Sequence, residues 1–228
     1  MSIRIYSTSY PAPVPAGIWQ PLLAQLPPDQ QQKVHNYRRW QDAHACLFGK
    51  HLLLGALQAE GRPGTLQDLL YTSYGRPYLS KGPDFNISHS GTRVVCILGS
   101  RAGVGIDLEE IREIAIGDFK GQFTTAEWQA IQVAEAPLQL FYHFWTAKES
   151  LSKADGRGLN LPLAGLVIEK NTTIQVDQRS WNIREIKAFP GYACHMALET
   201  GTEDWTQEPP VIEWSPDEIV TLSKSRRG

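Results

Sequence analysis

Apolar residues recur every three or four positions in two stretches near the start of the chain. The first stretch has apolar residues at Trp19, Leu22, Leu23 and Leu26. It ends at Pro27-Pro28, and the second, longer stretch runs from Asp29 to the break at Gly61-Arg62-Pro63-Gly64. The pattern predicts one short helix followed by one or two longer ones.

A different pattern follows, in which β-branched and aromatic residues fill short segments between turns. Residues 85–89 and 93–98 flank the turn Ser90-Gly91-Thr92 and predict a β-hairpin. Residues 104–109 come soon afterwards and predict a third strand. Consecutive strands with short connections favour an antiparallel meander, packed here against the upstream helices.

The second half of the chain repeats the order of helices before strands. Thr124 and Glu127 have the spacing of a helix capping box, and Pro137 suits the first position of a helix that ends near Gly156. The strands predicted after it are 166–168, 173–176, 181–187, 192–198 and 211–214. We therefore expect an α+β fold with two similar halves, residues 1–103 and 104–228, and a cleft between them.

Composition narrows the classes of function. Lys and Arg number 22 against 24 Asp and Glu, a formal net charge of -2, which argues against nucleic acid as a partner. The N-terminal segment lacks the pattern of a secretory signal and no run is apolar enough to span a bilayer, so we expect a cytoplasmic protein without a membrane anchor. Cys46, Cys96 and Cys194 are far apart and have apolar neighbours, which favours reduced core thiols.

Two carboxylates stand out on the strand predicted at 104–109. Asp107 and Glu109 are two residues apart, so they project from one face while Ile106 and Leu108 project from the other. Oxygen ligands without clustered Cys or His suit Mg²⁺ or Mn²⁺, and Gly105 would let a ligand approach the backbone. An exposed strand end with two solvated acids fits the same residues.

A second group of polar residues falls late in the helix that starts at Pro137. Glu149 and Lys153 are four residues apart and share one helix face. Glu149 fits a third oxygen ligand or a general base, and Lys153 fits a cation that neutralises a phosphate leaving group. An ordinary surface ion pair is the alternative.

Isolated basic residues complete the set of candidates. His89 follows Ser88 at the end of a predicted strand, a place where a side chain can protrude toward a phosphate or simply lie at the surface. The other candidates are scattered rather than grouped in a stripe, which fits discrete phosphate contacts. They are Lys33, Arg38, Arg39 and Arg76.

Three segments taken together resemble the signature blocks of the Sfp-type 4′-phosphopantetheinyl transferases, in order and in spacing. They are FNISHSG at 85–91, VGIDLEEI at 104–111 and FWTAKESLSKADGRGL at 144–159. Asp42-Ala43-His44 and Gly75-Arg76-Pro77-Tyr78 extend the resemblance to residues 28–165. It implies two pseudo-symmetric subdomains with coenzyme A in the cleft between them, and transfer of phosphopantetheine to a serine of an apo acyl or peptidyl carrier protein, with release of 3′,5′-ADP.

The resemblance also implies roles for individual residues. Asp107, Glu109 and Glu149 would hold Mg²⁺ on the pyrophosphate of coenzyme A. His89, with Ser88 beside it, would contact the 3′-phosphate, and Arg76 would lie near the same end of the molecule. Lys33 matches one of two lysines common in the family, whereas Gln30 stands near the position of the other, where Arg38 or Arg39 is a possible substitute.

The chemistry expected of such a site needs no nucleophile from the enzyme. Glu149, directly or through a metal-bound water, would take the proton of the attacking serine, and Lys153 would stabilise the charge on the pyrophosphate. A Mg²⁺-dependent nucleotide pyrophosphatase and a non-catalytic module that binds coenzyme A or a carrier remain alternatives. Phe119, Lys120 and Phe123 are a candidate rim for carrier docking, and we expect a monomer because two halves build the cleft within one chain.

Overall fold

The computed structural model describes residues 3–62, 64–99, 103–168, 173–201 and 208–225. Its helices confirm the predicted division of the early chain into a short helix and two further ones. They are α1 (Ala16–Leu23), α2 (Pro28–His35), α3 (Trp40–Ala59), α4 (Thr125–Val133), α5 (Pro137–Asp155) and α6 (Pro216–Ser225). One of the short 3₁₀ helices is Ile116–Gln122, which directly precedes α4.

The strands form two four-stranded sheets and a small hairpin. The first sheet has the order β10-β1-β5-β4 and the second β6-β9-β8-β7, while β2 and β3 pair separately. The bounds are β1 (Arg4–Ser9), β2 (Leu69–Tyr71), β3 (Pro77–Leu79), β4 (Asp84–Ser90), β5 (Arg93–Gly99), β6 (Val104–Glu110), β7 (Thr173–Val176), β8 (Arg179–Glu185), β9 (Tyr192–Glu199) and β10 (Val211–Glu213). All strand pairs are antiparallel except β1 with β10.

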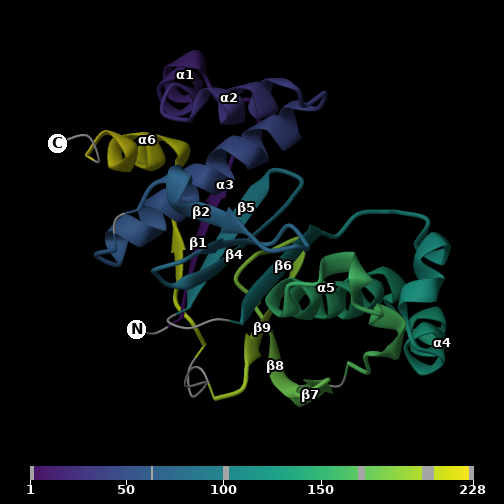
Figure 1. Ribbon diagram of the computed structural model, residues 1–228. Coiled ribbons are helices and arrows are strands. Elements are labelled where there is room, and N and C mark those ends of the chain that lie inside the picture. The colour runs from purple at the N-terminus through teal and green to yellow at the C-terminus, as the bar shows by residue number, and fades with distance from the viewer. Residues whose placement is uncertain (1–2, 63, 100–102, 169–172, 202–207, 226–228) are drawn as a thin grey trace.

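The two sheets are stacked, and helices cover their outer faces (Figure 1). Alternate residues of β5 divide between two cores: Val94, Cys96 and Leu98 pack with α3, whereas Val95 and Ile97 pack with residues of the second sheet. On the other side of the second sheet, Ala147 and Leu151 of α5 pack against it. This layering confirms the predicted α+β class with helices on small sheets.

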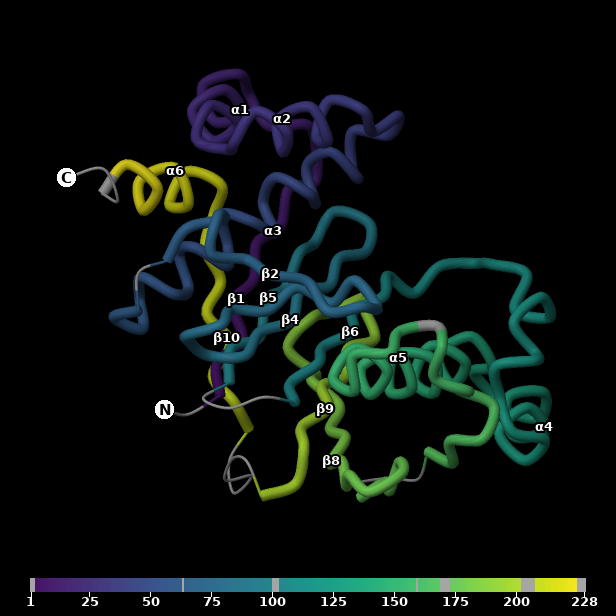
Figure 2. Tube along the Cα trace, in the orientation of Figure 1, coloured from purple at the N-terminus to yellow at the C-terminus, as the bar shows by residue number. Residues whose placement is uncertain are grey.

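The C-terminal part of the chain crosses back to the first sheet (Figure 2). Strand β10 pairs with β1, and α6 packs with the helical layer through Ile219 and Val220. The predicted division at residues 103 and 104 falls between β5 of the first sheet and β6 of the second. Since β10 and α6 lie with the first sheet, however, the two halves as continuous segments of chain stay a prediction.

Three details differ from the sequence-based expectations. The predicted meander is wrong at β6, because β5 already pairs with β4 on one side and with β1 on the other, so β6 pairs with β9. Strand β1 escaped prediction because its burial is almost complete on both faces and its sequence lacks alternation. The strand predicted at 166–168 is wrong as well, since this segment follows a 3₁₀ helix without pairing.

The remaining general expectations concern cysteines and membranes. Cys46, Cys96 and Cys194 are free thiols, two of them buried and Cys46 half-buried, as predicted. Within the described residues, no helix is both long enough and apolar enough to span a lipid bilayer.

Candidate active site

The predicted acids meet where α5 crosses β6. Ile106 and Leu108 are buried in the core between the two sheets, so Asp107 projects from the opposite face of β6, toward α5. Glu149 and Lys153 lie on α5 one turn apart. The alternation predicted from the sequence is therefore confirmed, and it brings acids from a strand and a helix to one place.

Asp107, Lys153 and Ser88 form a hydrogen-bonded triangle. The Lys153 ammonium donates to Asp107 Oδ1 at 2.6 Å and to Ser88 Oγ at 2.8 Å, and the Ser88 hydroxyl donates to Asp107 Oδ1 at 3.0 Å. The Asp107 side chain is 4% exposed and that of Lys153 27% exposed. The pair is thus shielded from bulk water on the acid side and open on the lysine side.

Strand β4 holds β6 through side chains rather than through backbone pairing. Every second residue of β4 accepts a hydrogen bond from a backbone N–H of β6 or of the residue just before it. The acceptors are Asp84 for Gly103 and Val104, Asn86 for Ile106, Ser88 for Leu108 and Ser90 for Glu110. This ladder joins the edges of the two sheets and aligns the site's strand against β4.

Ser90 has a double role in the ladder that the sequence analysis missed. Its hydroxyl donates to Glu109 Oε2 at 2.7 Å and accepts from the Glu110 N–H at 3.0 Å. The polar residues Asp84, Asn86, Ser88 and Ser90 alternate along this strand. That period of two places Ser90 on the same face as Ser88 and was the signal in the sequence for its role.

Replacing Ser90 by alanine is expected to lower the free energy of unfolding by about 1–3 kcal/mol, because a carboxylate oxygen and a backbone N–H both lose a partner. Chemical denaturation followed by circular dichroism measures the change. The exposed Ser73→Ala variant serves as the control, with no change expected. Equal stability of both variants would show that the ladder contributes nothing at this position.

The acids repel one another. Burial and the Asp107 carboxylate raise the pKa of Glu149, an effect that Lys153 partly offsets and Glu109 reinforces. Burial and Asp107 also raise the pKa of Glu109, against the hydrogen bond from Ser90. Among these acids, Asp107 Oδ2 and Glu149 Oε1 are buried and have no hydrogen-bond partner in the described part of the chain. The site therefore holds more negative charge than its own donors compensate.

This charge and the donor chemistry suit a hard divalent cation. Among the residues that the structure describes, no three His, Cys, Asp or Glu side chains are arranged to hold a metal ion as they stand. The orphaned oxygens of Asp107 and Glu149 are nevertheless the groups that a cation would satisfy, and carboxylates are the ligands that Mg²⁺ takes. The residues fit the predicted metal, with Lys153 as the cation that accompanies Asp107 here.

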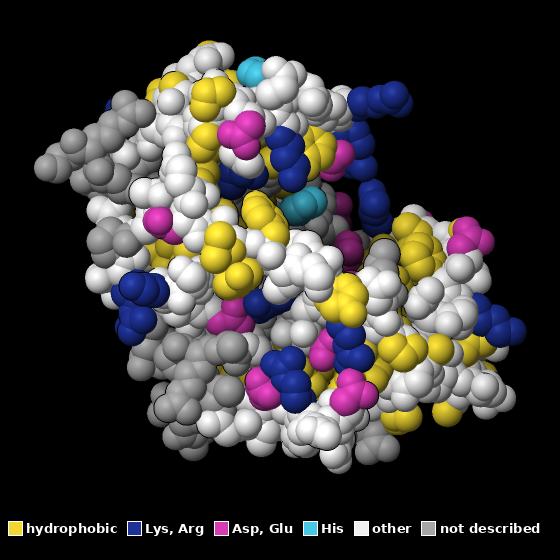
Figure 3. All heavy atoms as spheres, in the orientation of Figure 1, with side chains coloured by type: hydrophobic (Ala, Val, Ile, Leu, Met, Phe, Trp, Pro, Cys, Tyr) yellow, Lys and Arg dark blue, Asp and Glu magenta, His cyan; other side chains and the backbone are white. Residues whose placement is uncertain are grey.

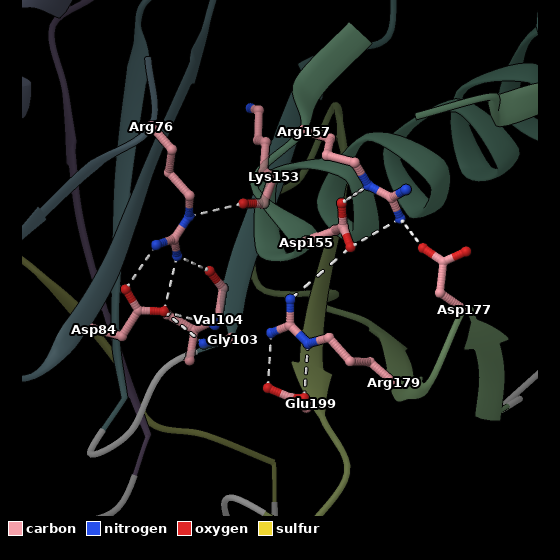
Figure 4. Close-up of polar contacts among 10 residues, drawn as sticks. All are labelled: Arg76, Asp84, Gly103, Val104, Lys153, Asp155, Arg157, Asp177, Arg179 and Glu199. Carbon is pink, nitrogen blue, oxygen red and sulfur yellow. Dashed lines mark hydrogen bonds and ion pairs between the residues drawn. The ribbon is translucent and has the colours of Figure 1, made fainter. Parts of the chain in front are cut away.

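The other candidates are placed unequally. His89 lies next to Ser88 on β4 and is exposed, and packing around its ring together with the Lys153 ammonium lowers its pKa. Lys33 lies on the exposed face of α2 and, within the described chain, makes no hydrogen bond or ion pair with the other candidates. Arg76 is close to Lys153 but donates to its backbone carbonyl and to Asp84 (Figure 4).

Helix α5 is anchored by a buried ion pair next to Glu149. The Lys148 ammonium, fully buried, lies 2.7 Å from Glu127 Oε2 and donates to two backbone carbonyls, those of Gln122 and Leu163. Glu127 also completes the predicted capping box with Thr124. The sequence analysis recognised the cap and missed the ion pair, which fixes the turn of α5 that carries Glu149.

The face shown in Figure 3 is hollowed between the part that carries α2 and α3 and the part that carries α4 and α5. Acidic side chains lie inside the hollow, and Lys and Arg side chains lie on its upper rim. The predicted docking rim is less open, because Phe123 is buried and Phe119 packs on Phe141 and Trp145. Phe123 thus belongs to the core of α4 and α5.

Comparisons with known proteins identify the family of the chain. Residues 103–205 match the model of the 4′-phosphopantetheinyl transferase superfamily. A 4′-phosphopantetheinyl transferase of Bacillus subtilis is 34% identical over 166 residues, which cover 71% of this chain and 74% of the relative. The transferase gsp of Aneurinibacillus migulanus is 30% identical over 84% of both chains, and Sfp of Bacillus subtilis 27% identical over 93% of this chain and 98% of Sfp. The chain belongs to the 4′-phosphopantetheinyl transferase superfamily.

Proposed function

We propose that this transferase moves the 4′-phosphopantetheine group from coenzyme A to a serine hydroxyl of an apo acyl or peptidyl carrier protein, with Mg²⁺ and with release of 3′,5′-ADP. The observation that supports it best is the convergence of Asp107, Glu149 and Lys153 at the crossing of β6 and α5. The carrier serine attacks the β-phosphorus, and the bond from that phosphorus to the oxygen bridging to ADP breaks.

Glu149 is the proposed base. Burial and Asp107 raise the pKa of Glu149, which makes its carboxylate a stronger base than an exposed glutamate. The carboxylate has two oxygens: Oε1, buried and without a hydrogen-bond partner in the described structure, would face the cation, and the other would accept the proton of the serine hydroxyl. The hydroxyl then attacks as an alkoxide-like oxygen, and the proton stays on Glu149.

Lys153 is the proposed cation for the leaving group. Two of its three N–H donors are engaged by Asp107 and Ser88, so one remains for an oxygen of the pyrophosphate. When bound by Asp107, Glu109 and Glu149, Mg²⁺ supplies further positive charge beside the same pyrophosphate. His89 is proposed to donate to the 3′-phosphate, which its exposed position on β4 permits, and Lys33 to approach the phosphates from α2. The monomeric state and the cytoplasmic location stay predictions.

Metal and pH dependence test this arrangement without relying on activity alone. Below the raised pKa values of Glu109 and Glu149 the carboxyls are protonated, so the acids repel less and the folded state gains stability; as pH rises through these values that stability is lost. Added Mg²⁺ with coenzyme A should therefore raise the unfolding temperature at pH 7.5 and much less at pH 5. A ligand present at one hundred times its Kd stabilises the folded state by about 2.7 kcal/mol.

Three observations together decide the outcome. Transfer, followed as the mass gain of an apo carrier, should stop on chelation of the metal. The thermal shift should vanish in Asp107→Asn and persist in the control Asp118→Asn, whose exposed carboxylate lies on the 3₁₀ helix before α4. A shift that is equal at both pH values, or intact in Asp107→Asn, contradicts the metal site. Release of 3′,5′-ADP without a modified carrier would indicate a pyrophosphatase instead.

A further inference from the structure

The guanidinium of Arg76 lies at a joint between four elements of the fold. It forms a two-pronged ion pair with Asp84, at 2.9 and 2.8 Å, and donates from Nε to the backbone carbonyl of Lys153 at 3.0 Å. A further bond of 2.9 Å reaches the carbonyl of Val104. Arg76 precedes β3, Asp84 begins β4, Val104 begins β6, and Lys153 lies in the last turn of α5 (Figure 4).

The donors of this guanidinium are almost all engaged. An arginine has five N–H donors, and those of Nε and Nη2 together with one of Nη1 point at protein acceptors. The Arg76 side chain is 13% exposed and that of Asp84 7% exposed. Asp84 is equally occupied, since Oδ2 also accepts from the N–H groups of Gly103 and Val104. A guanidinium so committed has little left for a phosphate.

Contacts of the arginine stem agree with a structural fit. Gly156 ends α5 with a left-handed backbone, at a φ of 93°. A Cβ built on Gly156 would lie 3.1 Å from Arg76 Cδ, so the arginine packs against the end of the helix. A cation beside the C-terminal carbonyls of a helix is also favoured by the helix dipole.

The far side of the same helix end is held by a second set of ion pairs (Figure 4). Asp155 accepts from Arg157, which also pairs with Asp177, and Arg179 forms a two-pronged pair with Glu199 of β9. Because Arg179 Nη1 also lies 3.9 Å from Asp155 Oδ2, the last turn of α5 is tied to the starts of β4 and β6 on one side and to β8 and β9 on the other. The Lys153 ammonium points away from the Arg76 guanidinium, toward Asp107.

We infer that Arg76 is a positioning residue: with Asp84 it sets the backbone of Lys153 against the start of β6, and it does not bind the 3′-phosphate of coenzyme A through its guanidinium. The inference rests on the proposed function, since it concerns the placement of the proposed leaving-group cation. Arg76 holds the backbone carbonyl of the residue whose ammonium reaches Asp107 and Ser88 at 2.6 and 2.8 Å.

The test compares Arg76→Met, Arg76→Lys, Asp84→Asn and the double variant Arg76→Met/Asp84→Asn with the wild type. Affinity for coenzyme A and for 3′-dephospho-coenzyme A is measured by calorimetry. The kcat of each variant is measured at 15 °C, after circular dichroism has shown that the variant is folded at that temperature. Lys81→Met, which removes an exposed cation between β3 and β4, is the matched control, with no change expected.

A positioning role predicts that each single variant lowers kcat about 10- to 100-fold, while the preference for coenzyme A over its dephospho form stays as in the wild type. Lysine should not rescue, because one ammonium cannot replace a planar fork that bonds to four residues, Asp84, Phe85, Val104 and Lys153. The double variant should be no worse than the poorer single variant, since both changes break one unit.

Two results overturn the inference. A loss of affinity for coenzyme A but not for the dephospho form in Arg76→Met, with Asp84→Asn unaffected, would make Arg76 a phosphate ligand. Lowered thermal stability with an unchanged kcat would make the joint a stabilising feature only. Failure of the wild type itself to modify any carrier would instead contradict the proposed function, so the two failures are distinguishable.

Discussion

Glu149→Gln is expected to lower the rate of phosphopantetheine transfer about 10²- to 10⁴-fold while coenzyme A still binds. General base catalysis contributes a factor of this size, and an amide cannot accept the serine proton. The glutamine side chain keeps the length and one carbonyl oxygen of the glutamate, so the packing of α5 on β6 should persist. The measurement is the intact mass of an apo carrier protein over time, with coenzyme A affinity determined separately by calorimetry.

The matched control is Glu135→Gln, an exposed glutamate two residues before α5 begins, which should transfer at the wild-type rate. A Glu149→Gln enzyme that regains full activity at high Mg²⁺ would show that Glu149 acts as a metal ligand and not as a base. A Glu149→Gln enzyme that transfers at the wild-type rate at the ordinary Mg²⁺ concentration would show that Glu149 takes no part in the chemistry.

Local patterns predicted much of this fold because they reflect forces within a few residues. The alternation of Ile106 and Leu108 with Asp107 and Glu109 follows from the strand period, and the end of α5 at Gly156 follows from helix capping. The partner of β6 depended instead on β1, a strand at the N-terminal end of the chain that pairs with the second edge of β5. No pattern within residues 93–109 contains that information.

The candidate site divides in the same way. Resemblance to family blocks pointed to Asp107, Glu149 and Lys153, and the structure brings two of them into direct contact and the third within electrostatic reach. The hydrogen bonds of Ser90 and the clamp of Arg76 on Asp84 depend on how separate elements meet. A sequence indicates that an arginine is present, but its partners follow only from the packing of β4, β6 and α5.

The crossing of β6 and α5 requires a glycine at position 105, and Gly105→Ala is expected to cost about 3 kcal/mol of stability or more. An added Cβ would lie 2.5 Å from Ala154 N and 2.9 Å from Ala154 Cα, and closer still to the Ser150 carbonyl oxygen. These are backbone atoms of a helix, which cannot rotate away as a flexible side chain can, so overpacking reaches the upper end of its usual cost. Chemical denaturation measures the change in the free energy of unfolding.

The same variant should also lose transfer activity under conditions in which it is folded. To relieve the clash α5 must move away from β6, and that movement separates Glu149 and Lys153 from Asp107, whose present contact with Lys153 is 2.6 Å. Gly117→Ala is the control, because nothing lies within 4 Å of its added Cβ. A Gly105→Ala protein that is less stable yet fully active in its folded form would show that transfer tolerates a wider separation of helix and strand, and the close approach would then serve stability alone.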